Sequence, residues 1–153
     1  MTDAAGIYAR ESDLLDCYVQ IGAAGERVLA VSFPGTPDAE AGTDHPLLDR
    51  IEAYFEGEDD DFADVTVALT VPTDQRNVLE AVREIPYGEQ VSVEQLTRMT
   101  AGLDPEDDDD RRQVRTALDA NPAPLLIPDH RVRDGPSGAP PGVVQQLRKV
   151  ERL

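Results

Sequence analysis

The chain has 153 residues with 31 acidic and 14 basic side chains, which gives a formal net charge of −17 at neutral pH. This length suits one domain or two small ones, and the apolar content is sufficient for a modest packed core. There is no long apolar run and no signal peptide, so we expect a cytoplasmic protein without a membrane partner. Cys17 is the only cysteine, which excludes an intramolecular disulfide and a cysteine-based metal cluster.

The charge is distributed unevenly along the sequence. Lys149 is the only lysine and aspartate outnumbers glutamate, a composition typical of salt-in halophiles such as halophilic archaea, where molar salt screens self-repulsion to within about 3 Å. An acidic regulatory protein of an ordinary cell is the alternative. Residues 1–110 carry a net charge of −21, whereas residues 111–153 carry +4. This asymmetry indicates an anionic partner for the basic end.

The first predicted element is a β hairpin. Residues 17–21 and 28–33 alternate or run apolar on either side of Gly22–Glu26, a loop that contains glycine. Residues 34–44 are rich in proline, glycine and acidic side chains, and they are predicted to form a connector.

A helix and a strand complete the first half. Residues 47–55 place apolar side chains at helical spacing, and Gly57 supplies a stop. Residues 65–71 are largely β-branched or apolar and follow an acidic loop, so they predict a strand. These elements together predict a small α+β unit over residues 1–70.

Helices dominate the predicted second half. Thr73 is expected to cap a helix that runs to about Glu84. Ser92 and Gln95 form a capping-box signal for a short helix. The apolar side chains that this short helix is expected to bury are Leu96 and Met99.

The next predicted helix carries the basic residues. Asp107–Asp110 lie before and within its first turn, where negative charge complements the helix dipole, and Asn121-Pro122 stops it. Two short helices joined by a loop, the second of them rich in arginine, are typical of a helix-turn-helix unit. Residues 143–152 predict a closing helix. The second helix is expected to bury Val114, Ala117 and Leu118 and to expose Arg111, Arg112 and Arg115.

Four short motifs follow one another between residues 71 and 132. They are Val71–Arg76, Ile85–Glu89 with Val91-Ser92, Arg112–Val114 before Asn121-Pro122, and Pro128-Asp129-His130-Arg131. Together they resemble the methylated-DNA–protein-cysteine methyltransferase family, whose members repair O6-alkylguanine by taking the alkyl group onto a cysteine thiolate. The resemblance implies an α+β fold, with a ribonuclease-H-like domain over residues 1–70 and a mostly helical, winged-helix-like (helix-turn-helix) domain over residues 71–153.

The chain departs from the family pattern at several positions. Asp129 stands where the family has its acceptor cysteine, Val93 replaces the base-flipping tyrosine, and Arg115 replaces a glycine. The family's Tyr-x-Gly-Gly loop is reduced to residues 139–142. For the glutamate that supports the family's histidine, Glu151 is the only candidate, and by counting it is out of register. These changes predict that alkyl transfer is lost, as in the alkyltransferase-like proteins, which also lack the cysteine.

The leading hypothesis is a non-enzymatic protein that binds double-stranded DNA and recognises alkylated guanine or related damage. In the family, the arginine at the position of Arg112 fills the gap that an extruded nucleotide leaves in the base stack. The resemblance implies no cofactor, a monomer, and excision-repair proteins as partners. The predicted phosphate contacts are Ser92, Arg111 and Arg115; the predicted base pocket consists of Asn121, Pro128, Asp129, His130 and Arg131, with Asp129 and His130 at the inactive catalytic position.

Other interpretations stay open. The arginines could pair with Asp107–Asp110 on a solvated helix face, and His130 could be a structural charge partner of Asp129. A protein-interaction module without DNA binding is favoured by Val93 in place of tyrosine and by the acidic run beside the basic helix. An alkyl-transfer enzyme would need Asp129 as its nucleophile. His45 has no second ligand at metal-binding spacing, so no metal site is predicted.

Overall fold

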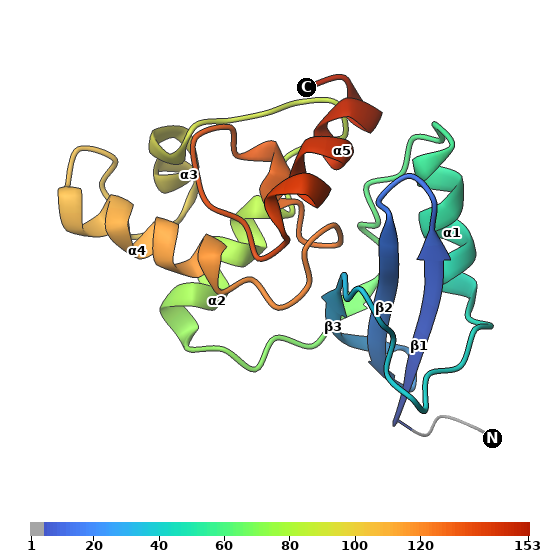
Figure 1. The fold of residues 1–153 in the computed structure, drawn as a ribbon. Coiled ribbons are helices and arrows are strands. Elements are labelled where there is room, and N and C mark those ends of the chain that lie inside the picture. Colours follow the sequence, from blue (N-terminus) through green and yellow to red (C-terminus); the bar gives the residue numbers. More distant parts are fainter. Residues whose placement is uncertain (1–4) are drawn as a thin grey trace.

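A four-stranded sheet forms one side of the molecule. In the computed structural model, which describes residues 5–153, β1 (Ala5–Ser12), β2 (Cys17–Ala24) and β3 (Arg27–Ser32) are antiparallel neighbours, and β4 (Thr66–Val67) pairs parallel with β3. In Figure 1 the helix of residues 46–55 lies beside this sheet, and the other helices are grouped to the left of it. The α+β class expected from the sequence is confirmed.

The predicted hairpin is present as β2 and β3. Gly25, with φ of 62°, supplies the left-handed conformation that its tight turn requires. Strand β1 was not predicted, because its small residues give no clear alternation. The strand predicted over residues 65–71 is wrong in extent, since only Thr66 and Val67 pair with β3. The N–H of Ala68 still donates to the carbonyl of Val28 at 2.8 Å, and the chain then leaves the sheet toward Pro72, which lacks a backbone donor.

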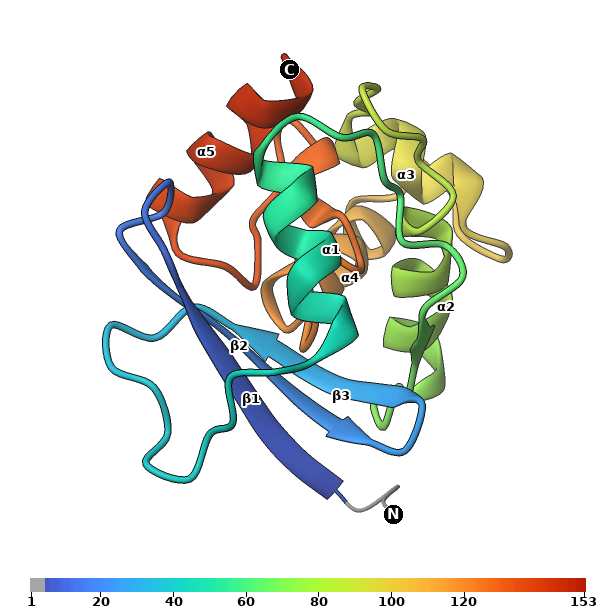
Figure 2. The same cartoon turned by 90° about the vertical axis from the view of Figure 1, so that its right-hand side faces the viewer.

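Helix α1 (Pro46–Phe55) confirms the helix predicted for the first half. His45 caps it, with Nδ1 accepting from the backbone N–H of Leu47 at 3.1 Å. The helix buries Leu47, Leu48, Ile51 and Tyr54. Figure 2 shows α1 in front of the sheet and beside α5, so its apolar face packs between the two halves of the chain.

The second half contains four α helices: α2 (Thr73–Val82), α3 (Val93–Met99), α4 (Asp108–Asp119) and α5 (Pro141–Glu151), with a short 3-10 turn η1 (Asp129–Arg131). The capping box of Ser92 and Gln95 is confirmed at α3. Two details are wrong. The N-cap of α2 is Pro72 and not Thr73, and Met99 is 38% exposed because it lies at the last turn of α3.

The buried core runs across residue 70 without interruption. Apolar side chains from both halves belong to one cluster, and the backbone N–H of Val31 donates to the carbonyl of Pro122 at 3.0 Å. The domain boundary at residues 70 and 71 stays a prediction. Within residues 5–153, no helix is long and apolar enough to cross a membrane.

The cap of α4 allows a stability test. Asp107 accepts from the N–H groups of Asp109 and Asp110 at 2.8 and 3.2 Å. We expect Asp107→Ala to lower the free energy of unfolding by about 1 kcal/mol, because two helix N–H groups lose their partner. Urea unfolding at constant salt measures this, with Glu106→Ala as the control on an adjacent exposed carboxylate. Equal losses in both variants would refute the capping role.

Candidate functional site

The chain between α4 and η1 is folded around Asn121. Its side-chain oxygen accepts from the N–H of Ala123 at 3.0 Å, and its amide nitrogen donates to the carbonyl of Ile127 at 2.9 Å. Between them, Leu125 is held at φ of 82°, a left-handed conformation that is costly for a residue with a large side chain. This constrained turn delivers η1, with Asp129, into the protein interior.

Asp129 is 1% exposed, and both oxygens of its carboxylate are hydrogen-bonded. Oδ1 accepts from the hydroxyl of Ser137 at 2.6 Å. Oδ2 accepts from the N–H of Gly138 at 2.8 Å and from the side-chain amide of Asn121 at 3.0 Å. Burial raises the pKa of Asp129 above its usual value, and these three hydrogen bonds oppose the rise.

Residues 133–139, the cover loop, lie over this carboxylate. At one end of the loop, Asp134 accepts from the N–H of Val93 at 2.7 Å. In the middle, Gly135 lies so close to its neighbours that an added Cβ would be 2.8 Å from a methyl group of Leu118 and 3.1 Å from one of Val132. The loop is therefore packed tightly between α3, α4 and the acceptor position.

The predicted pocket residues come together, but in the interior. Asn121 is 5% exposed, and Asp129, His130 and Arg131 are each at most 1% exposed. Pro128 is also buried. With the cover loop in place, these side chains do not line a surface that a base can reach.

Glu151 is the centre of a second buried cluster, which we call the Glu151 hub. Its Oε1 accepts from Arg131 Nε at 2.8 Å and from the N–H of Gly88 at 3.0 Å. Its Oε2 accepts from His130 at 2.6 Å, from Arg131 Nη2 at 3.1 Å and from the hydroxyl of Tyr54. The judgement that Glu151 is out of register was wrong. The segment between η1 and α5 is short, and α5 brings Glu151 onto His130.

The hub determines the ionisation of its members. Burial alone would raise the pKa of Glu151, but the hydrogen bonds from His130 and Arg131 outweigh it and lower the pKa to about 2. An ionised carboxylate can only accept, so Nε2 of His130 carries the hydrogen. Burial, followed by the charge of Glu151, raises the pKa of Tyr54. His130 is thus paired with Glu151, and not chiefly with Asp129 as the alternative interpretation held.

The predicted phosphate contacts lie on α3 and α4. The side chain of Arg111 is ion-paired with Asp108 and also donates to the carbonyl of Pro105. Arg112 is 76% exposed and 3.3 Å from Asp109, a screened pair of little strength. Arg115 is exposed one turn further on. The pairing with the aspartate run therefore occurs at Arg111 and Arg112, and Arg115 extends the same face.

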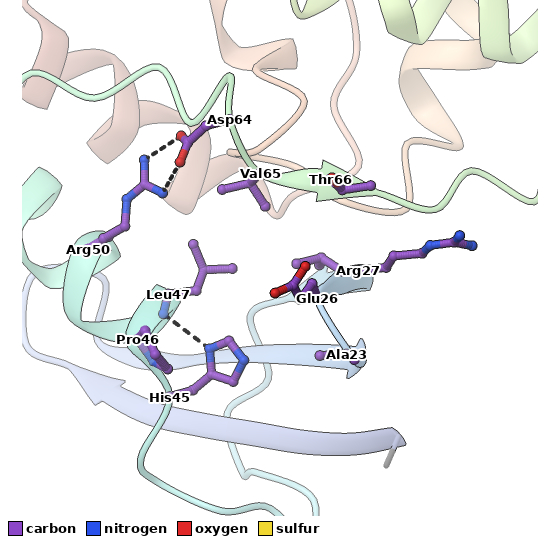
Figure 3. Close-up of a pocket in the computed structure, with 12 residues that line it drawn as sticks. Ala23, Glu26, Arg27, His45, Pro46, Leu47, Arg50, Asp64, Val65 and Thr66 are labelled. Atoms are coloured by element: carbon purple, nitrogen blue, oxygen red, sulfur yellow. Dashed lines mark hydrogen bonds and ion pairs between the residues drawn. The ribbon is translucent and has the colours of Figure 1, made fainter. Parts of the chain in front are cut away.

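A hollow in the other half of the molecule was not predicted from the sequence. It encloses about 420 Å³ between His45, Arg27, Arg50 and the end of β4. Figure 3 shows Arg50 directed to Asp64, and the ring of His45 bonded to the N–H of Leu47. Arg50 is also paired with Asp60. The guanidinium of Arg50 and Nδ1 of His45 are thus already engaged, and the side chain of Arg27 points away from both in Figure 3. Among residues 5–153, no cluster of three or more His, Cys, Asp or Glu side chains is placed to hold a metal ion.

Comparison with known proteins assigns the family. Residues 73–150 match the model of the 6-O-methylguanine DNA methyltransferase DNA-binding domain. The chain belongs to the 6-O-methylguanine DNA methyltransferase family. Among its relatives in this family, a methylated-DNA–protein-cysteine methyltransferase of Methanopyrus kandleri is 38% identical over 129 residues, which cover 81% of this chain and 93% of that protein.

Two further proteins are similar to this chain. A DNA base-flipping protein of Thermus thermophilus is 39% identical over 101 residues, which cover 65% of this chain and 64% of that protein. The crystal structure of Mycobacterium tuberculosis OGT in complex with DNA aligns with a TM-score of 0.71 at 22% identity, over 97% of this chain and 91% of that one. This structural likeness establishes the shared fold.

The contacts of Ser137, Gly138 and Tyr54 and the position of Glu151 were not predicted from the sequence. Ser137 and Gly138 lie in a short loop whose composition gave no signal, and their donors converge only when the loop folds over Asp129. Tyr54 was assigned to the core from its helical spacing. A polar role could have been suspected, because a buried tyrosine hydroxyl needs a partner.

The Glu151 hub predicts a specific response to acid. A lowered folded-state pKa stabilises the protein above the unfolded value of about 4.5, and this stability is lost as pH falls toward about 2. We expect the residue to contribute about 3 kcal/mol across this window. In Glu151→Gln, Arg131 is buried without its counter-ion, so the variant should lose about 3–5 kcal/mol near neutral pH and show a flatter acid limb.

Urea unfolding at pH 7, 5, 4 and 3 in constant KCl measures both effects. Glu94→Gln, on the exposed face of α3, is the matched control. If the two variants follow the wild-type pH profile equally, the hub does not contribute to acid stability.

Proposed function

We propose that this chain is a non-enzymatic DNA-binding protein of the alkyltransferase-like kind, which recognises alkylated guanine without removing the alkyl group. One observation carries the proposal. At the position where the family resemblance requires an acceptor cysteine, Asp129 is buried and its two oxygens accept three hydrogen bonds. Nothing of this carboxylate faces an incoming alkyl carbon.

The contacts of Asp129 argue against the enzymatic alternative. A nucleophile must direct an available lone pair at the reacting carbon, and a positioned base normally activates it. Here both oxygens are hydrogen-bonded, Oδ1 to Ser137 and Oδ2 to Gly138 and Asn121. Nε2 of His130 is committed to Glu151 at 2.6 Å. A carboxylate is also a harder and weaker nucleophile than a thiolate.

The basic face of α4 supports DNA binding. Arg112 and Arg115 are exposed on adjacent turns of one helix, and residues 111–153 carry a net charge of +4 on an otherwise acidic chain. We assign Arg112 to the gap left by an extruded base, and Ser92, Arg111 and Arg115 to phosphates of the duplex. The name of the Thermus thermophilus relative, a DNA base-flipping protein, agrees with this assignment.

The proposal extends to the surroundings of the complex. On this view α3 and α4 act as a winged-helix-like DNA-binding unit beside a ribonuclease-H-like one, and excision-repair proteins act on the marked site. The acidic, lysine-poor composition suits molar salt. Because phosphate contacts weaken steeply with salt, base insertion must supply much of the affinity.

Fluorescence anisotropy tests DNA recognition directly. A short duplex with one O6-methylguanine is titrated against its unmodified counterpart in about molar KCl. We expect tighter binding of the lesion, and loss of this preference in Arg112→Ala, because the gap in the stack is no longer filled. Arg27→Ala, an exposed arginine on β3, is the control and should bind as wild type. Absence of binding to either duplex would reject the proposal and favour the protein-interaction module.

Mass spectrometry of the intact protein tests the loss of transfer. After incubation with O6-benzylguanine, the wild-type mass should be unchanged; addition of a benzyl group at Asp129 would instead identify an alkyl-transfer enzyme. In Asp129→Cys the His130–Glu151 pair remains beside a thiol, so we expect slow addition of one benzyl group. Asp129→Ser is the control of similar size. If Asp129→Cys also stays unmodified, the missing cysteine alone does not explain the inactivity.

A further inference from the structure

Three hydrogen-bond donors converge on one point beneath the cover loop. They are the hydroxyl of Ser137, the backbone N–H of Gly138 and the side-chain amide of Asn121, all within 2.6–3.0 Å of the Asp129 carboxylate. Asn121 is fixed independently by Ile127 and Ala123. Within residues 5–153, every partner of this carboxylate is a donor.

Such a set of donors also selects the chemistry of an external guest. A base that entered here would have to present acceptors, and the N7 and O6 atoms of guanine are two adjacent acceptors. Adenine presents an amino donor beside its N7, so this amino group would face one of the donors of the site. The site is therefore suited to the acceptor edge of a guanine-type base, but the Asp129 carboxylate already occupies it.

We propose that Asp129 is a built-in ligand that latches the cover loop shut, and that a guanine-type base enters only after the carboxylate releases Ser137 and Gly138. The proposal rests on the proposed function, since it concerns how the same site admits a base. It assigns Asp129 a role that a cysteine could not fill, because a thiol is a weak acceptor.

The two ends of the cover loop are held unequally. At the first end, the N–H of Arg133 donates to the carbonyl of Val91 at 2.9 Å, and Asp134 accepts from the N–H of Val93, so this end is built into the start of α3. At the second end, Ser137 and Gly138 are tied to Asp129, Gly138 is exposed but lies close to the backbone of Asn121, and Ala139 is buried. Release of the latch would thus free Ser137 and Gly138, while Arg133 and Asp134 stay in place.

The latch imposes a cost on base capture. An entering base must replace Asp129 as the acceptor of the three donors. The measured affinity is therefore the intrinsic affinity multiplied by the fraction of molecules whose latch is released. Weakening the latch by one hydrogen bond should raise this fraction about tenfold. The same change should leave the exposed arginines of α4 unaltered, because they lie outside the loop.

Two variants test the latch with little change in volume. Ser137→Ala removes the hydroxyl that donates to Asp129 and that accepts from the N–H of Ala139 at 3.0 Å, and Asp129→Asn keeps the shape but replaces one acceptor oxygen by an amino group. Amide hydrogen exchange should be about tenfold faster at Gly138 in Ser137→Ala and at Ala139 in Asp129→Asn, because in each case the direct acceptor of that N–H is unchanged, while the amide of Leu96 in α3 stays as in wild type. Ser12→Ala, which removes a hydroxyl bonded to the N–H of Leu15 at 3.3 Å, is the matched control.

Anisotropy then measures base capture. We expect the preference for the O6-methylguanine duplex over the unmodified duplex to rise about tenfold in Asp129→Asn, which leaves Ser137, Gly138 and Asn121 in place. Ser137→Ala should gain less, because it also removes one of the donors that would face the base. Unchanged exchange at Gly138 and Ala139 would overturn the latch. Faster exchange in Asp129→Asn with an unchanged preference would overturn it as well, because a loop that opens without admitting a base does not act as a latch.

Failure of the proposed function is recognised separately. If no variant binds either duplex, DNA binding is rejected, and the latch is judged by exchange and by calorimetry with O6-benzylguanine alone. Binding of this free base to Asp129→Asn but not to wild type would support the latch without any DNA contact. Absence of binding to both proteins would overturn it.

Discussion

The Glu151 carboxylate connects three parts of the chain that are far apart in the sequence. It joins Tyr54 of α1, His130 and Arg131 of η1, and the backbone at Gly88. Arg131 also donates to the carbonyl of Ile85 at 2.7 Å and lies over the ring of Tyr87. A buried guanidinium is tolerable only with its charge paired and its N–H groups bonded, so the orientation of η1 depends on Glu151. The position of Asp129 follows from that orientation.

This dependence gives the retained histidine and glutamate a structural explanation. In a cysteine-bearing relative such a pair would lie beside the acceptor thiol, where it could influence ionisation. In this protein the same pair completes the hydrogen bonding of Arg131 and Tyr54. Loss of either partner would leave a charged or polar group buried without a contact, whatever the chemistry at position 129. Their presence is therefore no sign of catalysis by itself.

Local features were predictable from the sequence, and contacts made between distant segments were not. The hairpin, α1, the capping box at Ser92 and the aspartate cap of α4 each follow from a few adjacent residues, and all are present. The family motifs located Asp129. The position of Glu151 was predicted wrongly, because the spacing along the sequence does not show how the short loop between η1 and α5 places the helix. The contacts of Ser137 and Gly138 could not be predicted for the same reason, since they form only when that loop folds over Asp129.

The bond between Tyr54 and Glu151 spans 97 residues of the chain. Contacts of such separation form late, because the entropy of closing a long loop must be overcome before the contact contributes. During synthesis, α1 and the sheet emerge well before α5, so Tyr54 and Arg131 have no Glu151 carboxylate to bond to until α5 is made. An emerging chain can therefore build its secondary structure early, but its interior reaches the final arrangement only when α5 docks. We therefore expect the docking of α5 to be the last step of folding.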